Sequence, residues 1–334
     1  MHYRTLGKTG LKISEIGFGC GNNAVLMVRA SYEEQVRAVR RALEVGINYF
    51  DTAFAYGLGK SEENLGKILN VLGVSPVVST KIRLEPAAAG HLNSATIQAV
   101  EEGLKRLKRK SVDLIQLHNR VTVERSQSKR FSVTPRDVVG PGGVLEGFKE
   151  MRDKGKVRYF GFSGLGDTKA LHEVIDSGEF HSVQAYYNLL NPSGGQPVAQ
   201  GFSALDYGRL IDRAAAKGMG VAVIRVLAAG ALTSDPTAGG GSSPEPLSPG
   251  SDYSLDLERA QKLKFLIGGD IKSLTQAAIR FALMKPEVST VLVGFSNTSH
   301  IDEAVVCSGA GRLPEESMAR LRKLWDGDFG RLNA

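Results

Sequence analysis

Four side chains that can handle a proton stand at or just beyond the ends of three apolar runs. Asp51 ends "INYFD", Lys81 ends "PVVSTK" and His118 ends "VDLIQLH", while Tyr56 follows the first run in "TAFAYG". A free phenol has a pKa of about 10, and a neighbouring ammonium favours phenolate and lowers that pKa. A carboxylate paired with the ammonium would hold it in place. The set therefore predicts that Tyr56 donates a proton to a carbonyl oxygen, which also accepts a hydrogen bond from His118.

Taken singly, these residues have more ordinary roles. An isolated acid such as Asp51 is more often a helix cap or ion-pair partner, Tyr56 a loop anchor and Lys81 a solvated charge. Their coincidence at neighbouring strand ends is the pattern of a barrel active site. The set includes no strong nucleophile, so a cofactor has to attack the carbon, and hydride from a nicotinamide is the simplest choice. Two alternatives stay open: a dinucleotide-binding redox sensor or regulatory subunit with slow chemistry, and a Schiff-base isomerase or aldolase that uses Lys81.

Eight short β-rich runs alternate with helical patterns and must position these residues. Alternation of this kind indicates parallel strands with right-handed crossovers, in an open doubly wound sheet or a closed (β/α)8 barrel. The count of eight, with polar residues at strand ends, favours a single-domain barrel over residues 1–334. The opening "MHYRTLGKTGLKI" is expected to form a hairpin that caps the barrel's amino-terminal end. The runs are Lys12–Cys20, Ile47–Asp51, Pro76–Lys81, Val112–His118, Val157–Ser163, His181–Tyr187, Gly220–Val226 and Ser289–Phe295.

Helix signals and two long segments complete the pattern. Ser31 is a plausible N-cap and Gly46 a stop for the helix between them. Residues 119–143 and 234–254 are long connections after the fourth and seventh runs. Long irregular connections in a compact domain are usually functional or disordered. Both segments are expected on the face of the barrel that carries the active site.

Composition limits the class of protein. The chain has 334 residues, a net charge of +7 and 42% hydrophobic residues. Its densest basic run, "KRLKRK", ends a predicted helix, where cations complement the helix dipole, so nucleic acid is not an expected partner. With two cysteines and no metal-like His/Cys cluster, neither a disulfide framework nor a metal site is expected. No export signal or bilayer-spanning stretch is seen, so a cytoplasmic protein without a membrane partner is expected.

These motifs resemble the aldo-keto reductase family over nearly the whole chain. "GINYFDTAFAYGLGKSEENLG" is similar to the family signature G-x-x-x-x-D-T-A-x-x-Y-G-x-x-S-E-x-x-L-G, and "VVSTK", "DLIQLHN" and "GKVRYFGFSG" match later motifs in order. The resemblance implies a (β/α)8 barrel that catalyses NAD(P)H-dependent carbonyl reduction. It also implies a catalytic tetrad of Asp51, Tyr56, Lys81 and His118, with Tyr56 as the general acid.

The resemblance also implies a cofactor site. Ser163 and Gln184 match residues that hold the nicotinamide carboxamide, Gly164 replaces the usual Asn, and Ile224 occupies the slot of a stacking tyrosine. Arg225 is a candidate phosphate or substrate-anion contact, or else part of a rim ion pair. NADPH is favoured and NADH stays open, because the adenosine-end motif "GFSNTSHIDEA" has no Arg or Lys. The further candidate cofactor residues are Gly19, Cys20, Gly21, Asp51, Leu227, Ala228, Leu232, Gly294, Ser296, His300 and Glu303.

The expected substrate is a small carbonyl compound. Gly21 and Asn119 stand where the family often has aromatic residues, which indicates an open, polar pocket. Arginines near the strand ends hint at an anionic or polyhydroxylated substrate, while the exact carbonyl compound and the oligomeric state stay open. The candidate substrate-binding residues are Phe54, Arg83, His118 and Asn119, with Arg120 beside them; apart from His118, each could equally serve rim packing or solvation.

Overall fold

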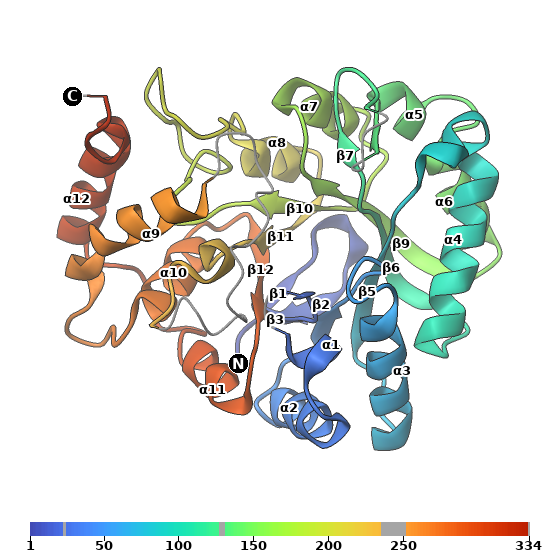
Figure 1. Cartoon of the computed structure of the whole chain (residues 1–334), viewed down its shortest axis with the longest axis horizontal. Coiled ribbons are helices and arrows are strands. Elements are labelled where there is room, and N and C mark those ends of the chain that lie inside the picture. Colours follow the sequence, from blue (N-terminus) through green and yellow to red (C-terminus); the bar gives the residue numbers. More distant parts are fainter. Residues whose placement is uncertain (23–24, 127–130, 235–251, 333–334) are drawn as a thin grey trace.

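Eight parallel strands close into a barrel with helices around it (Figure 1). The structure is a computed structural model and describes residues 1–22, 25–126, 131–234 and 252–332. Each barrel strand pairs in parallel with its neighbours, and the last strand closes onto the first. The expected (β/α)8 barrel is confirmed. Its strands are β3 (Ile16–Gly19), β4 (Tyr49–Asp51), β5 (Val77–Ile82), β6 (Val112–Leu117), β9 (Val157–Gly164), β10 (Ser182–Tyr186), β11 (Gly220–Ile224) and β12 (Val288–Gly294).

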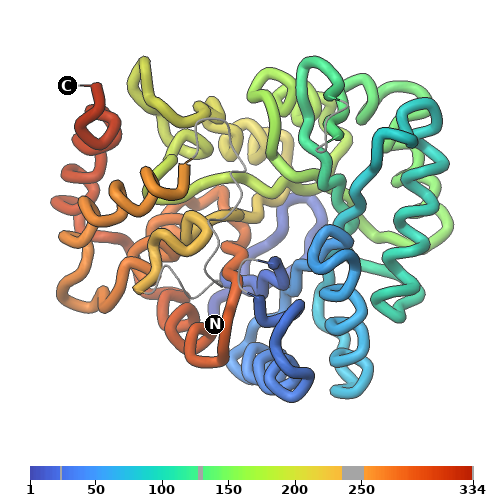
Figure 2. The backbone as a smooth tube through the Cα atoms, in the orientation of Figure 1, coloured from blue at the N-terminus to red at the C-terminus, as the bar shows by residue number. Residues whose placement is uncertain are grey.

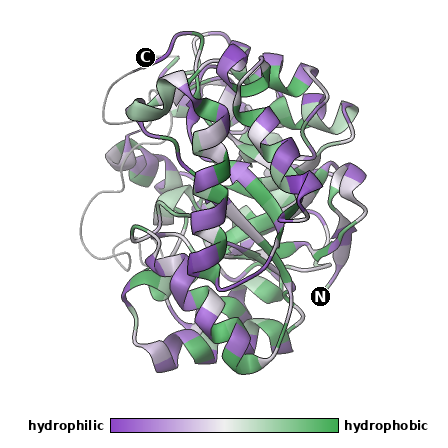
Figure 3. Ribbon diagram, turned by 90° about the vertical axis from the view of Figure 1, so that its right-hand side faces the viewer, coloured by the Kyte–Doolittle hydropathy of each residue, from purple (hydrophilic) through white to green (hydrophobic). Residues whose placement is uncertain are grey.

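Helices cover the outside of the barrel, and the tube in Figure 2 follows the chain around it in sequence order. In Figure 3 these helices carry hydrophobic and hydrophilic residues on different sides, as expected for amphipathic helices packed on a sheet. The helices are α1 (Leu26–Arg29), α2 (Tyr32–Glu44), α3 (Lys60–Leu72), α4 (Leu92–Leu107), α5 (Pro135–Val139), α6 (Val144–Asp153), α7 (Thr168–Asp176), α8 (Leu210–Ala216), α9 (Tyr253–Gln261), α10 (Leu274–Leu283), α11 (Thr298–Val305) and α12 (Glu315–Asp326).

The expected amino-terminal hairpin is present. β1 (Tyr3–Thr5) pairs antiparallel with β2 (Lys12–Ser14), so the run predicted as one strand over Lys12–Cys20 divides between the hairpin and β3. Leu6 and Ile13 from the hairpin are fully buried in a cluster with inward-facing strand residues such as Tyr49 and Leu114. Because this apolar plug fills the amino-terminal end of the barrel, polar chemistry is confined to the opposite end.

Local sequence features explain how the first two βα units form. Ser31 and Glu34 make a complete capping box at the start of α2, which satisfies two amide groups at the helix end. Gly46 follows the helix with φ of +90°, a conformation that favours glycine. In α3, a Cβ at Gly66 would lie 2.1 Å from the carbonyl oxygen of Leu107 at the end of α4. The last glycine of the "SEENLG" motif therefore allows two neighbouring helices to approach closely.

The two long connections differ in what the structure describes. Residues 119–143 contain β7 (Arg120–Val121), which pairs with β8 (Ser132–Val133), followed by the short helix α5. Residues 127–130 of that segment lie outside the described residues. Most of the 234–254 segment, residues 235–251, also lies outside them. Within the described ranges, no helix is long and apolar enough to cross a membrane.

Candidate active site

The carboxyl ends of β4, β5 and β6 place the four expected catalytic residues beside one another. Asp51 is the last residue of β4, Lys81 lies at the end of β5, and His118 directly follows β6. The strand register sets Asp51 opposite Ser79, two residues before Lys81 on the same face of β5. Tyr56 lies in the turn between β4 and α3, where its amide donates to the carbonyl of Ala53.

Lys81 is the centre of the group. Its Nζ donates to Asp51 Oδ2 at 2.5 Å, to the Thr52 carbonyl oxygen at 2.9 Å and to Tyr56 Oη at 3.1 Å. The Lys81 side chain has no exposed surface, and that of Asp51 is 4% exposed. A buried ammonium with three acceptors satisfies all of its N–H groups. The structure thus joins carboxylate, ammonium and phenol in one hydrogen-bonded chain.

The pKa of the Tyr56 phenol shifts in the direction opposite to the sequence-based expectation. Burial raises the pKa of Tyr56 above its ordinary value, although the Lys81 ammonium acts to lower it. The expected net lowering is therefore wrong, because removing the phenolate from water outweighs the attraction of the cation. Tyr56 accordingly carries its proton at neutral pH. The ammonium can still stabilise the phenolate that remains once the proton has left.

Lys81 and Asp51 both remain ionised and form a buried pair. Burial opposes the charge on Lys81, but Asp51 and Tyr56 raise the pKa of Lys81 overall. Burial also raises the pKa of Asp51, against the lowering effect of Lys81 and of hydrogen bonds from Ser79 and Gln184. In such a coupled pair each charge keeps the other ionised inside the protein. Lys81 is therefore a fixed cation beside the phenol.

His118 lies edge-on to the ring of Tyr56. The two ring centroids are 5.8 Å apart at an angle of 88°. Burial, followed by the cations of Lys81 and Arg83, lowers the pKa of His118 to about 3, so the imidazole is neutral at physiological pH. Its Nδ1 is buried and has no hydrogen-bond partner among the described residues. A neutral imidazole can polarise a substrate oxygen by hydrogen bonding without competing with Tyr56 as the acid.

Asp51 is held by amides that sequence analysis did not single out for this role. Gln184 Nε2 donates to Asp51 Oδ1 at 2.7 Å, and Gln116 Nε2 donates to the same oxygen at 3.3 Å and to Ser79 Oγ at 2.7 Å. Gln116 is fully buried. The strand alternation offered a signal, because Gln116 is two residues before His118 and so faces the same side of β6.

Several candidate cofactor residues surround this group. Gly19 pairs with Asp51 in the β3–β4 register, and the amide of Cys20 donates to the carbonyl of Asp51 at 2.9 Å. A Cβ at Gly21 would lie 3.7 Å from the Tyr56 ring, so this backbone borders the phenol. Ser163, opposite Gln184 in the β9–β10 register, is buried with a hydroxyl that has no hydrogen-bond partner among the described residues. A buried orphan hydroxyl requires a polar partner, and a nicotinamide carboxamide fits that requirement.

The turn after β11 holds the next candidates in a strained backbone. Arg225, Ala228 and Ala229 have φ values of +58°, +46° and +60°. Leu227 precedes the single turn of 3-10 helix at Ala228–Gly230, and Leu232 is fully buried behind it. No described carboxylate lies within ion-pair distance of Arg225, so the rim ion pair considered from the sequence is not seen among the described residues.

At the end of β12 the adenosine-end candidates lie close together. Gly294 is exposed, and the Ser296 amide donates to His300 Nδ1 at 3.5 Å. Asn297 caps α11 by accepting from the His300 amide at 3.2 Å. Glu303 accepts a hydrogen bond from Ser273 at 2.5 Å and so links α11 to the start of α10. One Glu303 oxygen thus has a structural partner.

The candidate substrate-binding residues differ in what they contact and in how exposed they are. The ring of Phe54 packs against the Arg106 guanidinium of α4, with 4.8 Å from Cζ to the ring centroid. Arg83 lies 3.7 Å from Glu85 and is one-third exposed. Asn119 is buried, and its amide bonds to the Leu84 backbone N–H and C=O and to the Phe131 carbonyl. Asn119 therefore ties two loops of the catalytic face together, and its amide is already occupied.

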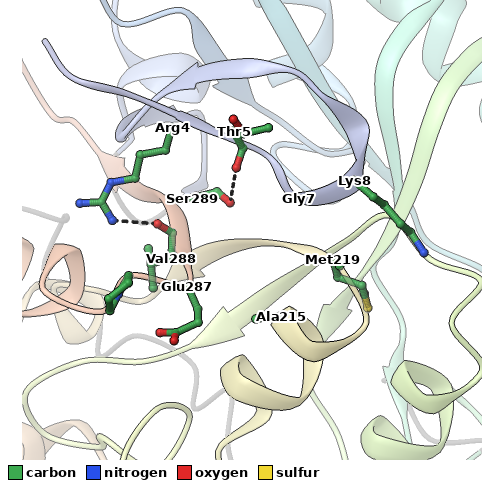
Figure 4. A pocket seen from close by; sticks show the side chains of 11 residues that line it. Arg4, Thr5, Gly7, Lys8, Ala215, Met219, Glu287, Val288 and Ser289 are labelled. Atoms are coloured by element: carbon green, nitrogen blue, oxygen red, sulfur yellow. Dashed lines mark hydrogen bonds between the residues drawn. The ribbon is translucent and has the colours of Figure 1, made fainter.

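A groove of about 400 Å³ lies at the other end of the barrel, between the hairpin and the start of β12 (Figure 4). Its lining groups bind one another: Arg4 donates to the Val288 carbonyl and Ser289 to that of Thr5. The hydrophobic plug separates this groove from the tetrad. Across the described ranges, no cluster of His, Cys, Asp or Glu has the form of a metal site.

Comparisons with known proteins agree with this geometry. A model described as the aldo/keto reductase family matches residues 15–326. L-galactose dehydrogenase from Arabidopsis thaliana is 29% identical over 309 residues, which cover 90% of this chain and 86% of that protein. The uncharacterized oxidoreductase YqkF from Bacillus subtilis is 26% identical over 340 residues, with 96% of each chain covered. The solved holo form of aldo-keto reductase AKR11C1 from Bacillus halodurans superposes with a TM-score of 0.72 at 24% identity and covers 98% of this chain and 97% of its own, a likeness of fold.

Proposed function

Because this chain belongs to the aldo/keto reductase family, we propose that it is an NAD(P)H-dependent reductase that converts an aldehyde or ketone to an alcohol. The observation that supports this most directly is the chain of hydrogen bonds from Asp51 through Lys81 to Tyr56. It provides a protonated phenol beside a fixed cation, with a neutral imidazole facing the same ring. These groups together suit protonation of a carbonyl oxygen.

In the proposed reaction, the substrate oxygen lies between Tyr56 and His118. When bound, a nicotinamide supplies hydride to the carbonyl carbon. Tyr56 Oη transfers its proton to the oxygen as negative charge develops there, and His118 donates a hydrogen bond to that oxygen. The Lys81 ammonium, 3.1 Å from Tyr56 Oη, stabilises the phenolate that forms. Asp51 keeps Lys81 in place.

We propose that Ser163 and Gln184 hold the carboxamide of the cofactor. The unpartnered Ser163 hydroxyl supports this assignment. Gln184 Nε2 already donates to Asp51, so its carbonyl oxygen is the group left for the cofactor amide. The backbone of Gly19–Gly21 would border the same ring. At the other end of the cofactor, the residues after β12 would hold the adenosine, and we propose NADP(H) as the preferred form.

Replacement of Tyr56 by Phe tests the proposal. The variant should bind NADPH within about twofold of the wild type while turnover of an aldehyde panel falls by about 10²–10⁴-fold, the usual contribution of a general acid. Tyr3→Phe is a control for loss of a hydroxyl, because Tyr3 is exposed and its hydroxyl donates to the Gly46 carbonyl, away from the tetrad. Turnover that survives in Tyr56→Phe would rule out the assigned acid.

The same assay, run with NADPH and with NADH, separates the alternatives. Tight binding of a dinucleotide with negligible wild-type turnover would favour a sensor or regulatory subunit. Turnover without any nicotinamide, together with borohydride trapping of substrate on Lys81, would favour Schiff-base chemistry. Steady-state oxidation of either nicotinamide by aldehydes, lost in Tyr56→Phe, is the expected result.

A further inference from the structure

Arg225 is a cation at the catalytic face that has no ion-pair partner among the residues that the structure describes. It directly follows β11, which lies opposite β5, the strand that carries Lys81, in the closed strand order. Its guanidinium forms no ion pair and no hydrogen bond with any described residue. A partly buried guanidinium that has lost water without gaining a carboxylate is costly. Such a group is expected to be satisfied by an anion from outside the chain.

The backbone fixes this arginine in an unusual conformation. Arg225 has φ of +58°, which is rare for a residue with a side chain. Asn188 Nδ2 donates to the Arg225 carbonyl at 2.9 Å and so holds the turn from the neighbouring β10 side. Strain of this kind persists only where the surrounding structure imposes it, and it clusters at ligand clamps and active sites.

Among the described residues, no carboxylate lies within ion-pair distance of the Arg225 guanidinium. The ring of Tyr186 from β10 stacks on that of Tyr207, with centroids 5.5 Å apart. Burial lowers the pKa of Arg225, while Tyr186, Tyr56 and Asp256 act to raise it, so these groups lie within electrostatic reach of the guanidinium. Burial, in turn, raises the pKa of Asp256 to about 6 against the effect of Arg259 and Arg225. Asp256 therefore acts on Arg225 only from beyond ion-pair distance.

The proximity to Tyr56 indicates which molecule supplies the anion. Tyr56 is the proposed donor to the carbonyl oxygen of the substrate, and Arg225 follows β11 at the same carboxyl-end rim of the barrel as the turn after β4 that carries Tyr56. Arg83, which lies 3.7 Å from Glu85, also contributes to the electrostatics of His118 at this rim. A cation at a ligand-binding rim attracts anionic ligands.

We propose that Arg225 binds an anionic group of the substrate, so that the preferred substrates are aldehydes or ketones carrying a carboxylate or a phosphate. This inference rests on the proposed reductase function. A guanidinium suits both anions because its planar fork donates two parallel hydrogen bonds. The pyrophosphate of the cofactor is the other source of such an anion, and the experiment separates the two.

The test uses pairs of aldehydes that differ only in charge. 4-Oxobutanoate is compared with its methyl ester, and glyceraldehyde 3-phosphate with glyceraldehyde, in wild type, Arg225→Gln and Arg225→Lys. In the wild type, kcat/KM should favour at least one anionic member by about tenfold or more. Arg225→Gln should lower kcat/KM for that anion by about 30-fold or more, as loss of a partner from a desolvated charge pair does, while the neutral member changes far less. Arg225→Lys should restore part of the preference.

Two further measurements make each outcome decisive. The Kd of NADPH, from fluorescence titration, should stay within about twofold in Arg225→Gln, because a charge contact to the cofactor would weaken it much more. Arg213→Gln removes the same charge from an exposed ion pair with Asp176 and should leave the anion preference unchanged. Weakened NADPH binding with an unaltered anion preference would assign Arg225 to the cofactor and overturn the proposal. So would a wild type without any preference for anions.

Failure of the proposed function would look different. If no nicotinamide-dependent turnover is seen, calorimetry with succinate reports on the anion site by itself. Binding of succinate to the wild type, lost in Arg225→Gln and retained in Arg213→Gln, would support the anion site while the reductase proposal fails. Absence of succinate binding as well would overturn both.

Discussion

Replacement of Lys81 by Met offers the sharpest test of how the buried charges are held. The Lys81 side chain has no exposed surface, and its ammonium contacts Asp51, Thr52 and Tyr56. Methionine has a similar length but no charge, so the cavity stays filled. The Asp51 carboxylate keeps hydrogen bonds from Gln184 and Gln116 but loses its counter-ion.

The expected magnitude follows from burial. Removing one partner of a buried ion pair usually costs about 3–5 kcal/mol, because the remaining charge is left unpaired. The double variant Asp51→Asn/Lys81→Met has no such charge. Since replacing both members of a buried pair by uncharged groups is often close to neutral, it should be more stable than Lys81→Met by at least about 2 kcal/mol. Both variants should lack measurable turnover.

The pH dependence of the stability of Lys81→Met tests the direction in which the pKa of Asp51 shifts. Burial raises the pKa of Asp51 in the folded protein, and Lys81 acts to lower it, so Lys81→Met should raise the pKa of Asp51 further. An acid whose pKa is raised on folding binds more protons in the folded state, so its folded state loses stability as pH rises between the unfolded and folded pKa values. Lys81→Met should therefore be relatively more stable at acidic pH, while the double variant should not share this trend.

Urea unfolding followed by circular dichroism at about pH 5 and pH 8 measures these differences, provided that the m-values agree. Lys154→Met is a control, because Lys154 pairs with Glu150 on the surface and its loss should hardly move the midpoint. Equal stability of Lys81→Met and the wild type, or a double variant less stable than Lys81→Met, would refute the view that Asp51 and Lys81 are a mutually dependent buried pair.

Further predictions concern the imidazole, the thiols and the supporting amide. Because burial lowers the pKa of His118 to about 3, kcat for a neutral aldehyde should show no inflection from this residue between about pH 5 and 8; a limb near the ordinary histidine pKa of about 6.5 that disappears in His118→Gln would contradict this. Cys20 and Cys307 are buried with raised pKa values, so a thiol reagent should label neither in the folded protein and both in urea; rapid labelling under native conditions would contradict the burial. Gln116→Leu should lower kcat by roughly tenfold, with the KM for substrate little changed, because the Asp51 carboxylate loses one of its hydrogen bonds. If kcat of Gln116→Leu equals that of the wild type, the Gln116 side chain contributes only to packing.

Alternation along the chain was enough to predict the barrel and the end at which its chemistry lies. Eight apolar runs separated by helical patterns leave few ways to pair parallel strands, and polar residues at the ends of consecutive runs must then meet at one rim. Asp51, Lys81 and His118 follow this rule directly. Tyr56 was found through its spacing from Asp51 in a specific motif. The division of Lys12–Cys20 between the hairpin and β3 was missed, because both parts have the same apolar character.

The tertiary structure decided what each polar group contacts and in what environment. The direction of the Tyr56 pKa depends on the balance between desolvation and a cation 3.1 Å away, and neither burial nor distance is written in the spacing of residues. Asn119 looks like a pocket residue in the sequence, yet its amide binds the backbone of two loops. The lack of an ion-pair partner for Arg225 within the described part of the chain also became evident only once its neighbours were placed. Sequence periodicity fixes which face of an element a residue occupies, whereas electrostatics depend on separations of a few ångströms between residues far apart in the chain.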